Sequence, residues 1–341
     1  MGYTVNTMDM KTAMQRAAFA LILCLSLLLG CQQTDSDDAV LLLPSPTVEA
    51  PLTPLPTAAP SPTATATPSP TPTATPSPTP AGLIGGKYDV FSYEGTMEGD
   101  LSYVSDKLSI RLSTHTDNPY SRSRLVYYVA DIYLQDITSF RTAAAKDFLT
   151  DSRRPMKTVA AGVNAILAAN GDFSCGKKSL LMIRNGNLEQ LAFSRNRETC
   201  LLYRDGTMAV FTPDTLSEAD LDMERIWQAW QFGPYLINED GTPRTTYTTN
   251  ANFGQNPRTV LGYYEPGHYC LVVVDGRKSS HSLGLTLPEL SQLMVDLGCT
   301  QAFNLDGGAT SQLYWQGDIF NVPSGNRNQL DILYFVEPEG E

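Results

Sequence analysis

Three short segments place a carboxylate where an apolar run ends and glycine begins. They read Asn170-Gly171-Asp172-Phe173, Asp275-Gly276-Arg277 and Asn304-Leu305-Asp306-Gly307-Gly308. Each segment alone is typical of a tight turn, because Asp-Gly and Gly-Gly pairs tolerate positive φ. Their recurrence favours a second interpretation, in which several strand ends converge on one rim and supply carboxylates for acid and base catalysis.

Asp172 and Asp306 are the predicted catalytic pair, as acid and base or as nucleophile. Position in the sequence does not assign the two roles, because the separation of the carboxylates in space decides between inversion and retention. Arg258 could grip phosphate oxygens bidentately, or it could be a structural arginine that ties down a strand. The further candidates for substrate binding are Asn170, Asp275, Arg277, Ser282, Asn304, Gly307, Gly308 and Thr310.

A metal ion is an alternative use of the same oxygens. Asn304, Asp306 and Asp172 could hold Ca²⁺ or Mg²⁺, so the metal site is unknown and no cofactor is certain. Only three histidines occur, scattered at positions 115, 268 and 281, which disfavours a zinc hydrolase. The chain lacks the Gly-x-Ser-x-Gly elbow, the P-loop and the dinucleotide-binding glycine motif, so esterase, nucleotidase and dehydrogenase functions are without their signatures.

Residues 1–30 have the features of a bacterial lipoprotein signal peptide. A basic leader precedes an apolar run from Ala17 to Gly30, whose length suits a signal-peptide core better than a spanning helix. The run ends in Leu28-Leu29-Gly30-Cys31, which resembles a lipobox, the site at which a cysteine is diacylated. We therefore expect an exported protein, lipid-anchored to the membrane through Cys31; the alternative is an uncleaved anchor.

The rest of the chain divides into a linker and one large domain. Residues 31–81 are rich in Pro, Thr and Ser, a composition that predicts a disordered, semi-rigid spacer. Residues 82–341 are long enough for a single domain. The net charge of −12 argues against nucleic acid as a partner, because phosphate binding of that kind needs a basic face.

Strand signals dominate residues 82–341, and we predict a mixed, strand-rich α+β fold with few helices. Asn185-Gly186 and Glu265-Pro266-Gly267 are typical hairpin turns. A capping box of Thr286 and Glu289 begins one clear helix, which Gly298 ends. The expected strands cover residues 124–135, 158–169, 179–183, 259–264, 268–274 and 302–306.

Two further features have open interpretations. The segment 224–237, ERIWQAWQFGPYLI, predicts a short helix with Trp227 and Trp230 on one face, packed in the core in preference to forming a sugar platform. Four cysteines, which could form two disulfides in three ways or remain buried thiols, lie beyond the leader and the anchor: Cys175, Cys200, Cys270 and Cys299.

The motifs together resemble the phosphodiester glycosidase family, which includes the lysosomal uncovering enzyme. They are NGDF at 170–173, PRTVLGY at 257–263, VVVDGR at 272–277 and SLGLTLPELSQLMVDLGCTQAFNLDGGATSQ at 282–312, within a similarity from about residue 120 to 336. Two departures concern the rim: Ser174 stands where members often have a second Phe, and Ala309-Thr310 where they often have Gly-Ser.

The resemblance implies a hydrolase that removes a sugar such as N-acetylglucosamine from a phosphodiester in envelope or extracellular glycan. A glycosyl phosphodiester has a good leaving group, so its hydrolysis depends more on charge stabilisation than on a strong acid. The alternative is a catalytically inactive carbohydrate-binding or envelope-organising lipoprotein with the same fold, because a fold does not establish an activity.

Overall fold

The computed structural model describes residues 101–247 and 254–338, whose named strands form three antiparallel sheets. The six-stranded sheet runs β1 (Leu101–Val104), β2 (Leu108–His115), β3 (Tyr127–Leu134), β12 (His268–Val274), β11 (Arg258–Glu265), β13 (Gln301–Asn304). One five-stranded sheet runs β7 (Asn187–Gln190), β6 (Met182–Arg184), β10 (Ile226–Phe232), β8 (Glu198–Tyr203), β9 (Met208–Phe211). The other runs β15 (Asp318–Ile319), β14 (Leu313–Trp315), β5 (Leu167–Asn170), β16 (Asp331–Phe335), β4 (Phe140–Ala144).

Helices are few, as the sequence predicts. The described helices are α2 (Met156–Gly162), α3 (Leu287–Asp296) and the 3-10 turns η2 (Ile137–Ser139), η3 (Glu218–Asp220) and η4 (Gly308–Thr310). Neither α2 nor α3 is long and apolar enough to cross a bilayer. The strand-rich α+β fold is confirmed. The expected signal peptide, lipidated Cys31 and linker lie outside the described residues and stay predictions.

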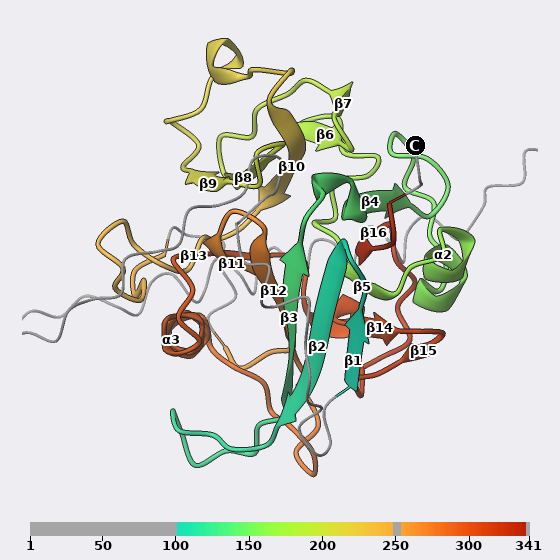
Figure 1. Cartoon of the computed structure of the whole chain (residues 1–341). Coiled ribbons are helices and arrows are strands. Elements are labelled where there is room, and N and C mark those ends of the chain that lie inside the picture. Colours follow the sequence, from blue (N-terminus) through green and yellow to red (C-terminus); the bar gives the residue numbers. More distant parts are fainter. Residues whose placement is uncertain (1–100, 248–253, 339–341) are drawn as a thin grey trace, which may run out of the picture. The chain divides into compact units, whose positions relative to one another are not determined.

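The six-stranded sheet is buried on both faces at its centre. It lies between α3 on one side and β5, β14 and β16 on the other (Figure 1). Alternate residues of β12 enter two different cores: Leu271 and Val273 pack into one, and Val272 and Val274 into the other. This double burial explains why the strand reads as a continuous apolar run without a polar alternation. The second core lies beneath α3, whose Leu290 and neighbours cover it.

The predicted hairpins and the predicted α3 are confirmed. Asn185 and Gly186 both have positive φ at the β6–β7 turn, as the Asn-Gly dipeptide favours. Glu265-Pro266-Gly267 joins β11 to β12. The side chain of Thr286 accepts from Glu289 N, and the carboxylate of Glu289 accepts from Thr286 N, which completes the capping box.

Two secondary-structure predictions are wrong. Residues 156–162 form α2, and only the end of the expected 158–169 strand exists, as β5; the buried positions Met156, Val159 and Ala160 have helical spacing. The segment with Trp227 and Trp230 is strand β10, in which an irregular register between Ile226 and Gln228 allows both rings to enter one core. Their burial in the core is confirmed.

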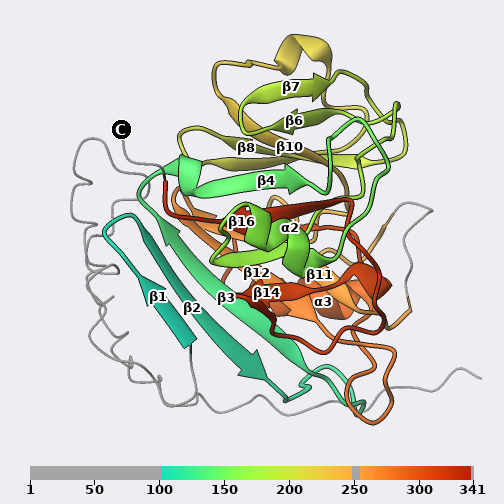
Figure 2. The same cartoon turned by 90° about the vertical axis from the view of Figure 1, so that its right-hand side faces the viewer.

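The sheets stack around the region that will hold the site. Figure 2 shows β6, β7, β8 and β10 above β4 and β16. Hydrogen bonds join the two five-stranded sheets there, from Thr142 Oγ1 to Gln228 Oε1 at 3.1 Å and from Asn185 Nδ2 to Thr142 O at 2.9 Å. Asp172, just after β5, and Asp331, at the start of β16, lie against Arg184 of β6. Asn304, at the end of β13, bonds Gly233, just after β10.

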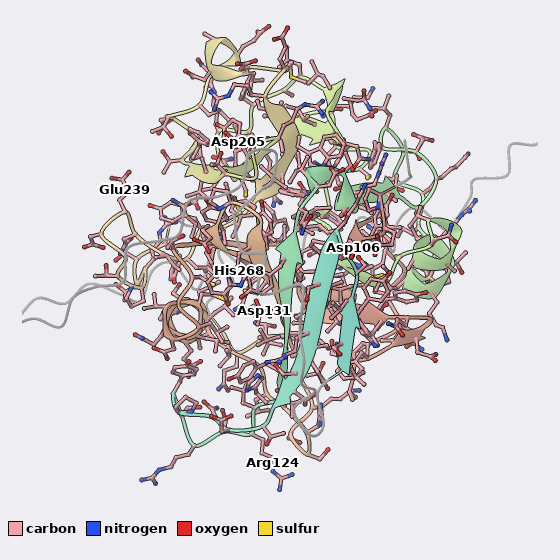
Figure 3. The ribbon with its side chains drawn as sticks, viewed as in Figure 1. Asp106, Arg124, Asp131, Asp205, Glu239 and His268 are labelled. Atoms are coloured by element: carbon pink, nitrogen blue, oxygen red, sulfur yellow. The ribbon has the colours of Figure 1, made fainter. Side chains whose placement is uncertain are left out.

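The four described cysteines are buried free thiols, one of the two expected states. The histidines are dispersed: His268 on β12 faces Asp131 on β3 at 2.7 Å (Figure 3), and His281 contacts Asp275. The third, His115, stacks on Tyr127. None of the three lines the cavities described below.

Candidate active site

Asp306 follows β13 and begins the turn η4. Its carboxylate accepts from Gly307 N and from Thr310 Oγ1, each at 2.9 Å, so its orientation is fixed from both oxygens. Burial raises the pKa of the Asp306 carboxyl, while these two hydrogen bonds and the charges of Arg327 and Arg153 act in the opposite direction. Asp306 is thus a rigidly held carboxyl with an elevated tendency to keep its proton.

Asn170 fastens the end of β5 to Asp306. Its Nδ2 donates to Asp306 O at 2.6 Å, and its Oδ1 accepts from Thr259 Oγ1 at 2.7 Å. The backbone N of Asp306 also donates to Gly171 O at 3.3 Å. The strand ends at 170–173 and 304–308 therefore meet, as their shared pattern predicts. The side chain of Asn170 acts as the link between them.

Asp306 lines a cleft of about 910 Å³. Gly307 and Gly308 lie beside it in the same wall, and Asn304 contributes a side chain that is almost wholly buried. Asn304 Nδ2 donates to Gly233 O, but its buried Oδ1 has no hydrogen-bond partner in the described part of the chain. A buried acceptor without a partner is costly, so a donor from a ligand would relieve it.

Arg258 lines the same cleft but is held by backbone oxygens. Its Nε donates to Leu285 O at 3.0 Å and its Nη2 to Gly254 O at 2.8 Å. Burial, together with the charge of Arg277, lowers the pKa of Arg258 to about 10. Arg258 therefore ties β11 to two neighbouring segments, which was the structural interpretation, while it still contributes positive charge to the wall.

Arg277 reaches the glycine turn from the opposite segment. Its Nε and Nη2 donate to Asn256 Oδ1 at 3.0 and 2.8 Å. Gly308 has a φ of +69°, and a Cβ on it would stand 3.0 Å from both Nη atoms of Arg277. The absence of a side chain at Gly308 is thus what allows the guanidinium to lie against the turn, within the cleft that Asp306 lines.

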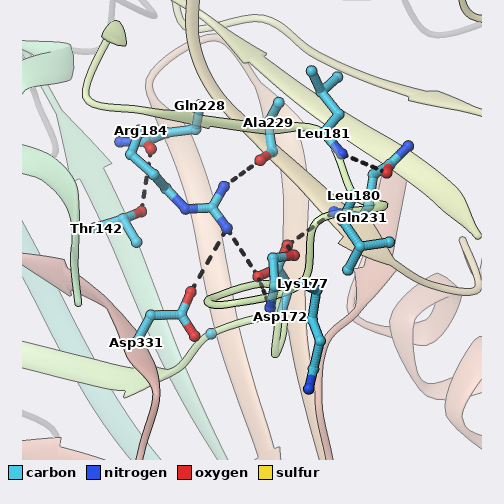
Figure 4. Close-up of polar contacts among 12 residues, drawn as sticks. Thr142, Asp172, Lys177, Leu180, Leu181, Arg184, Gln228, Ala229, Gln231 and Asp331 are labelled. Atoms are coloured by element: carbon cyan, nitrogen blue, oxygen red, sulfur yellow. Dashed lines mark hydrogen bonds and ion pairs between the residues drawn. The ribbon is translucent and has the colours of Figure 1, made fainter. Parts of the chain in front are cut away.

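Asp172 does not open onto this cleft. Its carboxylate is fully buried and receives Arg184 Nη2 at 2.9 Å, Ser174 Oγ at 2.6 Å and Gln231 N at 2.8 Å (Figure 4). The expected pairing of Asp172 with Asp306 over one pocket is therefore not what the structure shows. Ser174, the departure from the family pattern, supplies one of the bonds that enclose the carboxylate.

Asp331, at the start of β16, is a buried carboxyl that the sequence did not reveal. Arg184 Nη2 lies 3.6 Å from Asp331 Oδ2 but only 2.9 Å from Asp172 Oδ1, so the guanidinium pairs more closely with Asp172 than with Asp331 (Figure 4). Burial and the neighbouring charge of Asp172 raise the pKa of Asp331 to about 8. A carboxylic acid that keeps its proton at neutral pH is a candidate proton donor.

Asp331 and Asp306 share a small cavity. It has a volume of about 10 Å³ and is also lined by Asn170, Gly171 and Thr310. Such a volume is about that needed for one water molecule. A Cβ on Gly171 would collide with the Asp331 carboxyl, which explains the glycine in this motif. The only sequence signals for this site were an acidic residue at the head of an apolar strand and Arg184 at the end of another.

Asp275 and Ser282 lie elsewhere. The Asp275 carboxylate is buried and accepts from Tyr128 Oη, His281 and Asn321, while Ser282 Oγ donates to Asp275 O. Neither residue lines the cavities that contain Asp306. The third strand end therefore does not bring its carboxylate to the rim, and only Arg277 from that segment does.

The expectation of Ca²⁺ or Mg²⁺ stays a prediction. Within residues 101–247 and 254–338, no three His, Cys, Asp or Glu side chains gather in a way that could hold a metal ion. A hard cation at Asp306 would consequently need oxygens from the backbone, water or a substrate phosphate.

Known proteins resemble this chain in sequence and in fold. The phosphodiester glycosidase family matches residues 161–335, slightly more than half of the chain. The SPbeta prophage-derived uncharacterized protein YomE of Bacillus subtilis (strain 168) is 31% identical over 203 residues, covering 57% of this chain and 31% of that protein. The chain thus spans about a third of the length of this curated relative.

Two solved structures share the fold. The catalytic domain of zebrafish N-acetylglucosamine-1-phosphodiester alpha-N-acetylglucosaminidase, auto-inhibited by its pro-peptide, matches with a TM-score of 0.56 at 19% identity, covering 69% of this chain and 85% of that chain. A hypothetical protein from Synechocystis matches with a TM-score of 0.52 at 11% identity, covering 69% and 63%. At these identities the similarity concerns the arrangement of the strands.

Proposed function

The chain belongs to the phosphodiester glycosidase family, and we propose that it hydrolyses the glycosidic bond of a sugar 1-phosphodiester in the cleft lined by Asp306. Membership of the family supports a glycosidase-type function, and the residues of the cleft support this particular reaction. The observation that carries it is the juxtaposition of a fixed carboxylate, Asp306, with the open backbone of Gly307 and Gly308 and the cations Arg258 and Arg277.

The charge of the cleft suits a phosphodiester. The chain as a whole has 24 Lys and Arg against 36 Asp and Glu. The cleft reverses this balance among the described residues that line it. Its acidic side chains are Glu198, Asp214 and Asp306, and its basic ones are Lys177, Arg195, Arg197, Arg244, Arg258 and Arg277. Arg244 is neutralised by Glu198 at 2.8 Å. A focused positive potential of this kind attracts an anionic substrate.

Two carboxyls would divide the chemistry. Hydrolysis breaks the bond from C1 of the sugar to the bridging oxygen, and water gives its hydroxyl to C1 and its proton to a base. Asp306, when ionised, would stabilise the oxocarbenium-like carbon or accept the proton from water. Asp331, protonated at neutral pH, would supply a proton across the small cavity. Asp172 would act through Arg184 and Asp331 as a positioning residue.

The finer assignments extend this proposal. The substrate sugar would resemble N-acetylglucosamine, in envelope or extracellular glycan, because a relative of the same fold carries that sugar in its name. The leader and Cys31 support export and anchoring to the bacterial cell membrane through a lipid. These assignments rest on the sequence and on the relative, and the cleft is compatible with them.

A carbohydrate-binding protein without activity is the competing function. The enclosure of Asp172 favours it, since only one of the two expected carboxylates reaches the cleft. It predicts saturable binding of a sugar phosphodiester with no product. Asp331 removes part of this objection, because it provides a second carboxyl within the same small cavity as Asp306.

The test is product analysis with the methyl phosphodiester of α-N-acetylglucosamine 1-phosphate. The full chain should release free N-acetylglucosamine and methyl phosphate, and Asp306→Asn should not. A matched variant, Asp318→Asn on the exposed surface of β15, should retain activity. Equal turnover by Asp306→Asn would refute the proposal, and binding without turnover by the wild type would support the inactive alternative.

A further inference from the structure

Three cations converge on one aromatic ring at the edge of the site. Arg153 Cζ, Lys177 Nζ and Arg327 Cζ lie 5.2, 4.8 and 5.5 Å from the centroid of the Phe173 ring. They come from three separate segments of the chain, so the convergence is a product of folding. These four residues are called the Phe173 cation cluster below.

The cluster contains no ion pair, and the charges of Arg153 and Arg327 act on Asp306 only from beyond ion-pair distance. None of its three cations forms an ion pair with a carboxylate in the part of the chain that the structure describes. Like charges held around one ring repel each other, and a ring face compensates only part of that repulsion. An acidic chain that gathers unpaired cations leaves a place for an anion from outside.

The backbone of Phe173 is also unusual. Its φ of +68° lies in the left-handed region, which a bulky residue rarely adopts. Strain of this kind persists where the surrounding structure enforces it, and it is concentrated at functional sites. Here it turns the ring toward the cavities, because Phe173 lines both the small cavity with Asp306 and the large cleft.

Cations around Asp306 therefore fall into two groups on different elements. Arg258 and Arg277 stand at the Gly307-Gly308 turn in the large cleft. Arg153 lines the small cavity, and Lys177 lines the cleft from the Phe173 side. One phosphodiester carries a single negative charge, so one group is sufficient for it and the second remains without a ligand.

We propose that the Phe173 cation cluster binds a second phosphate of the substrate, and that the substrate is an oligomer or polymer of sugars joined through phosphodiesters. This inference rests on the proposed function and specifies its substrate class. One phosphate would lie at Arg277 and the next at the cluster, with Asp306 at the bond between sugar and phosphate. Hydrolysis adds water across that bond, so it leaves one fragment with a free C1 hydroxyl and the other with a phosphate monoester.

The experiment compares two substrates in the full chain: the methyl phosphodiester of α-N-acetylglucosamine 1-phosphate, and a synthetic trimer of the same sugar joined through 1,6-phosphodiesters. The wild type should show a KM at least about ten-fold lower for the trimer, since several charge contacts of modest strength are added. Arg153→Gln, Lys177→Gln and Arg327→Gln in combination should bring the ratio of the two KM values close to one. In the wild type, 0.5 M salt should reduce this ratio, because charges that are open to solvent are screened.

The matched control removes three charges elsewhere. Lys107→Gln, Lys157→Gln and Arg225→Gln together change the net charge equally, and none of these residues lines either cavity. This control should keep the wild-type ratio of KM values. A wild-type ratio near one, or an equal loss of the ratio in both triple variants, would overturn the inference. The inference would also be overturned if a trimer of galacturonic acid inhibited the enzyme with an inhibition constant equal to the KM of the phosphodiester trimer, because the cluster would then accept any anion.

Binding separates this inference from the proposed function. If neither substrate is turned over, the proposed hydrolysis is refuted. Titration calorimetry with the phosphodiester trimer then tests whether the Phe173 cation cluster binds a phosphate. If the triple variant of the cluster binds the trimer with an affinity at least ten-fold lower than the wild type, and the control variant binds it as the wild type does, the second phosphate site is supported. Absence of trimer binding by the wild type would refute both.

Discussion

Asn170 donates its side-chain amide to the backbone oxygen of Asp306 over 2.6 Å, and this bond helps to join the end of β5 to the end of β13. Asn170 also accepts from Thr259, so it connects three strands at the site. The position of the candidate catalytic carboxyl thus depends on a buried amide that belongs to a different sheet. Two sheets, and not one loop, determine where Asp306 lies.

Replacing Asn170 should therefore impair both folding and activity. Asn170→Ala leaves buried partners unsatisfied, and we expect a loss of about 1–3 kcal/mol in the free energy of unfolding, measured by urea titration. Asn321→Ala is the matched control. Asn321 is buried like Asn170 and forms side-chain hydrogen bonds of its own, to Leu313 N and to Asp275, but it lies away from the cleft. It should lose similar stability yet retain kcat, whereas an equal fall in kcat for both would show a general effect.

The fold was largely predictable, because its strongest signals are local. Hairpin turns, the α3 capping box and the apolar strands at 259–264 and 268–274 each follow from a few neighbouring residues, and these were confirmed. The errors at α2 and β10 arose where local periodicity was ambiguous. The short segment 156–162 fits two periods, and the Trp227–Trp230 spacing suits a helix unless a strand is irregular.

The site was only half predictable for a different reason. Asp306, Arg258 and Arg277 follow from motifs, and the structure brings them to one cleft. Asp331 and Arg184 have no motif around them. Both residues matter because they are buried beside Asp172. This contact brings together β16, β6 and the 170–173 turn, and no short stretch of sequence predicts it. Asp172 itself has the right motif, but its strand end points inward.

The Arg184–Asp172 pair should be essential for stability. Asp172→Asn leaves a fully buried guanidinium whose remaining carboxyl, Asp331, must then ionise in the interior. Removing one partner of such a pair costs about 3–5 kcal/mol, which urea titration would detect. Asp318→Asn, which breaks the exposed pair with Lys157, should cost less than about 1 kcal/mol. A small effect of Asp172→Asn would show that Asp331 can replace it.

Asp331 should control the activity above neutral pH. If it donates a proton, kcat/KM should fall as pH rises through about 8, and Asp331→Asn should lose that limb of the profile together with up to about 100-fold in rate. The ionisation of Asp306 should set the opposite limb, with activity rising as pH passes its raised pKa. A variant that keeps the alkaline limb would assign that limb to another group.

The same carboxyl has a linked effect on folding. Its pKa is 3.8 in an ordinary environment and about 8 when folded, so the folded state binds the additional proton between these values. The stabilising contribution is complete below pH 4 and is lost as pH rises through about 8. The melting temperature of the wild type should therefore fall across this range more steeply than that of Asp331→Asn, in which the amide stays neutral.

Gly308 should be required for the cleft more than for the fold. Gly308→Ala introduces a Cβ 3.0 Å from the Arg277 guanidinium, which must then shift by a few tenths of an ångström, so we expect KM to rise by up to about ten-fold. Gly241→Ala is the control, because Gly241 also has positive φ, +80°, with open space around it. Both variants should lose about 1 kcal/mol from the backbone conformation. Equal KM values in the two would contradict a role for Gly308 in shaping the cleft.

The most direct test of the central claim is to locate the bond that is broken. The full chain is incubated with the methyl phosphodiester of α-N-acetylglucosamine 1-phosphate in ¹⁸O-labelled water, briefly enough that exchange at the free sugar can be corrected with unlabelled product. Glycosidic hydrolysis predicts ¹⁸O at C1 of the released sugar and unlabelled methyl phosphate, with no release by Asp306→Asn. Label in the phosphate would show attack at phosphorus and would contradict the assignment of Asp306 to glycosidic cleavage.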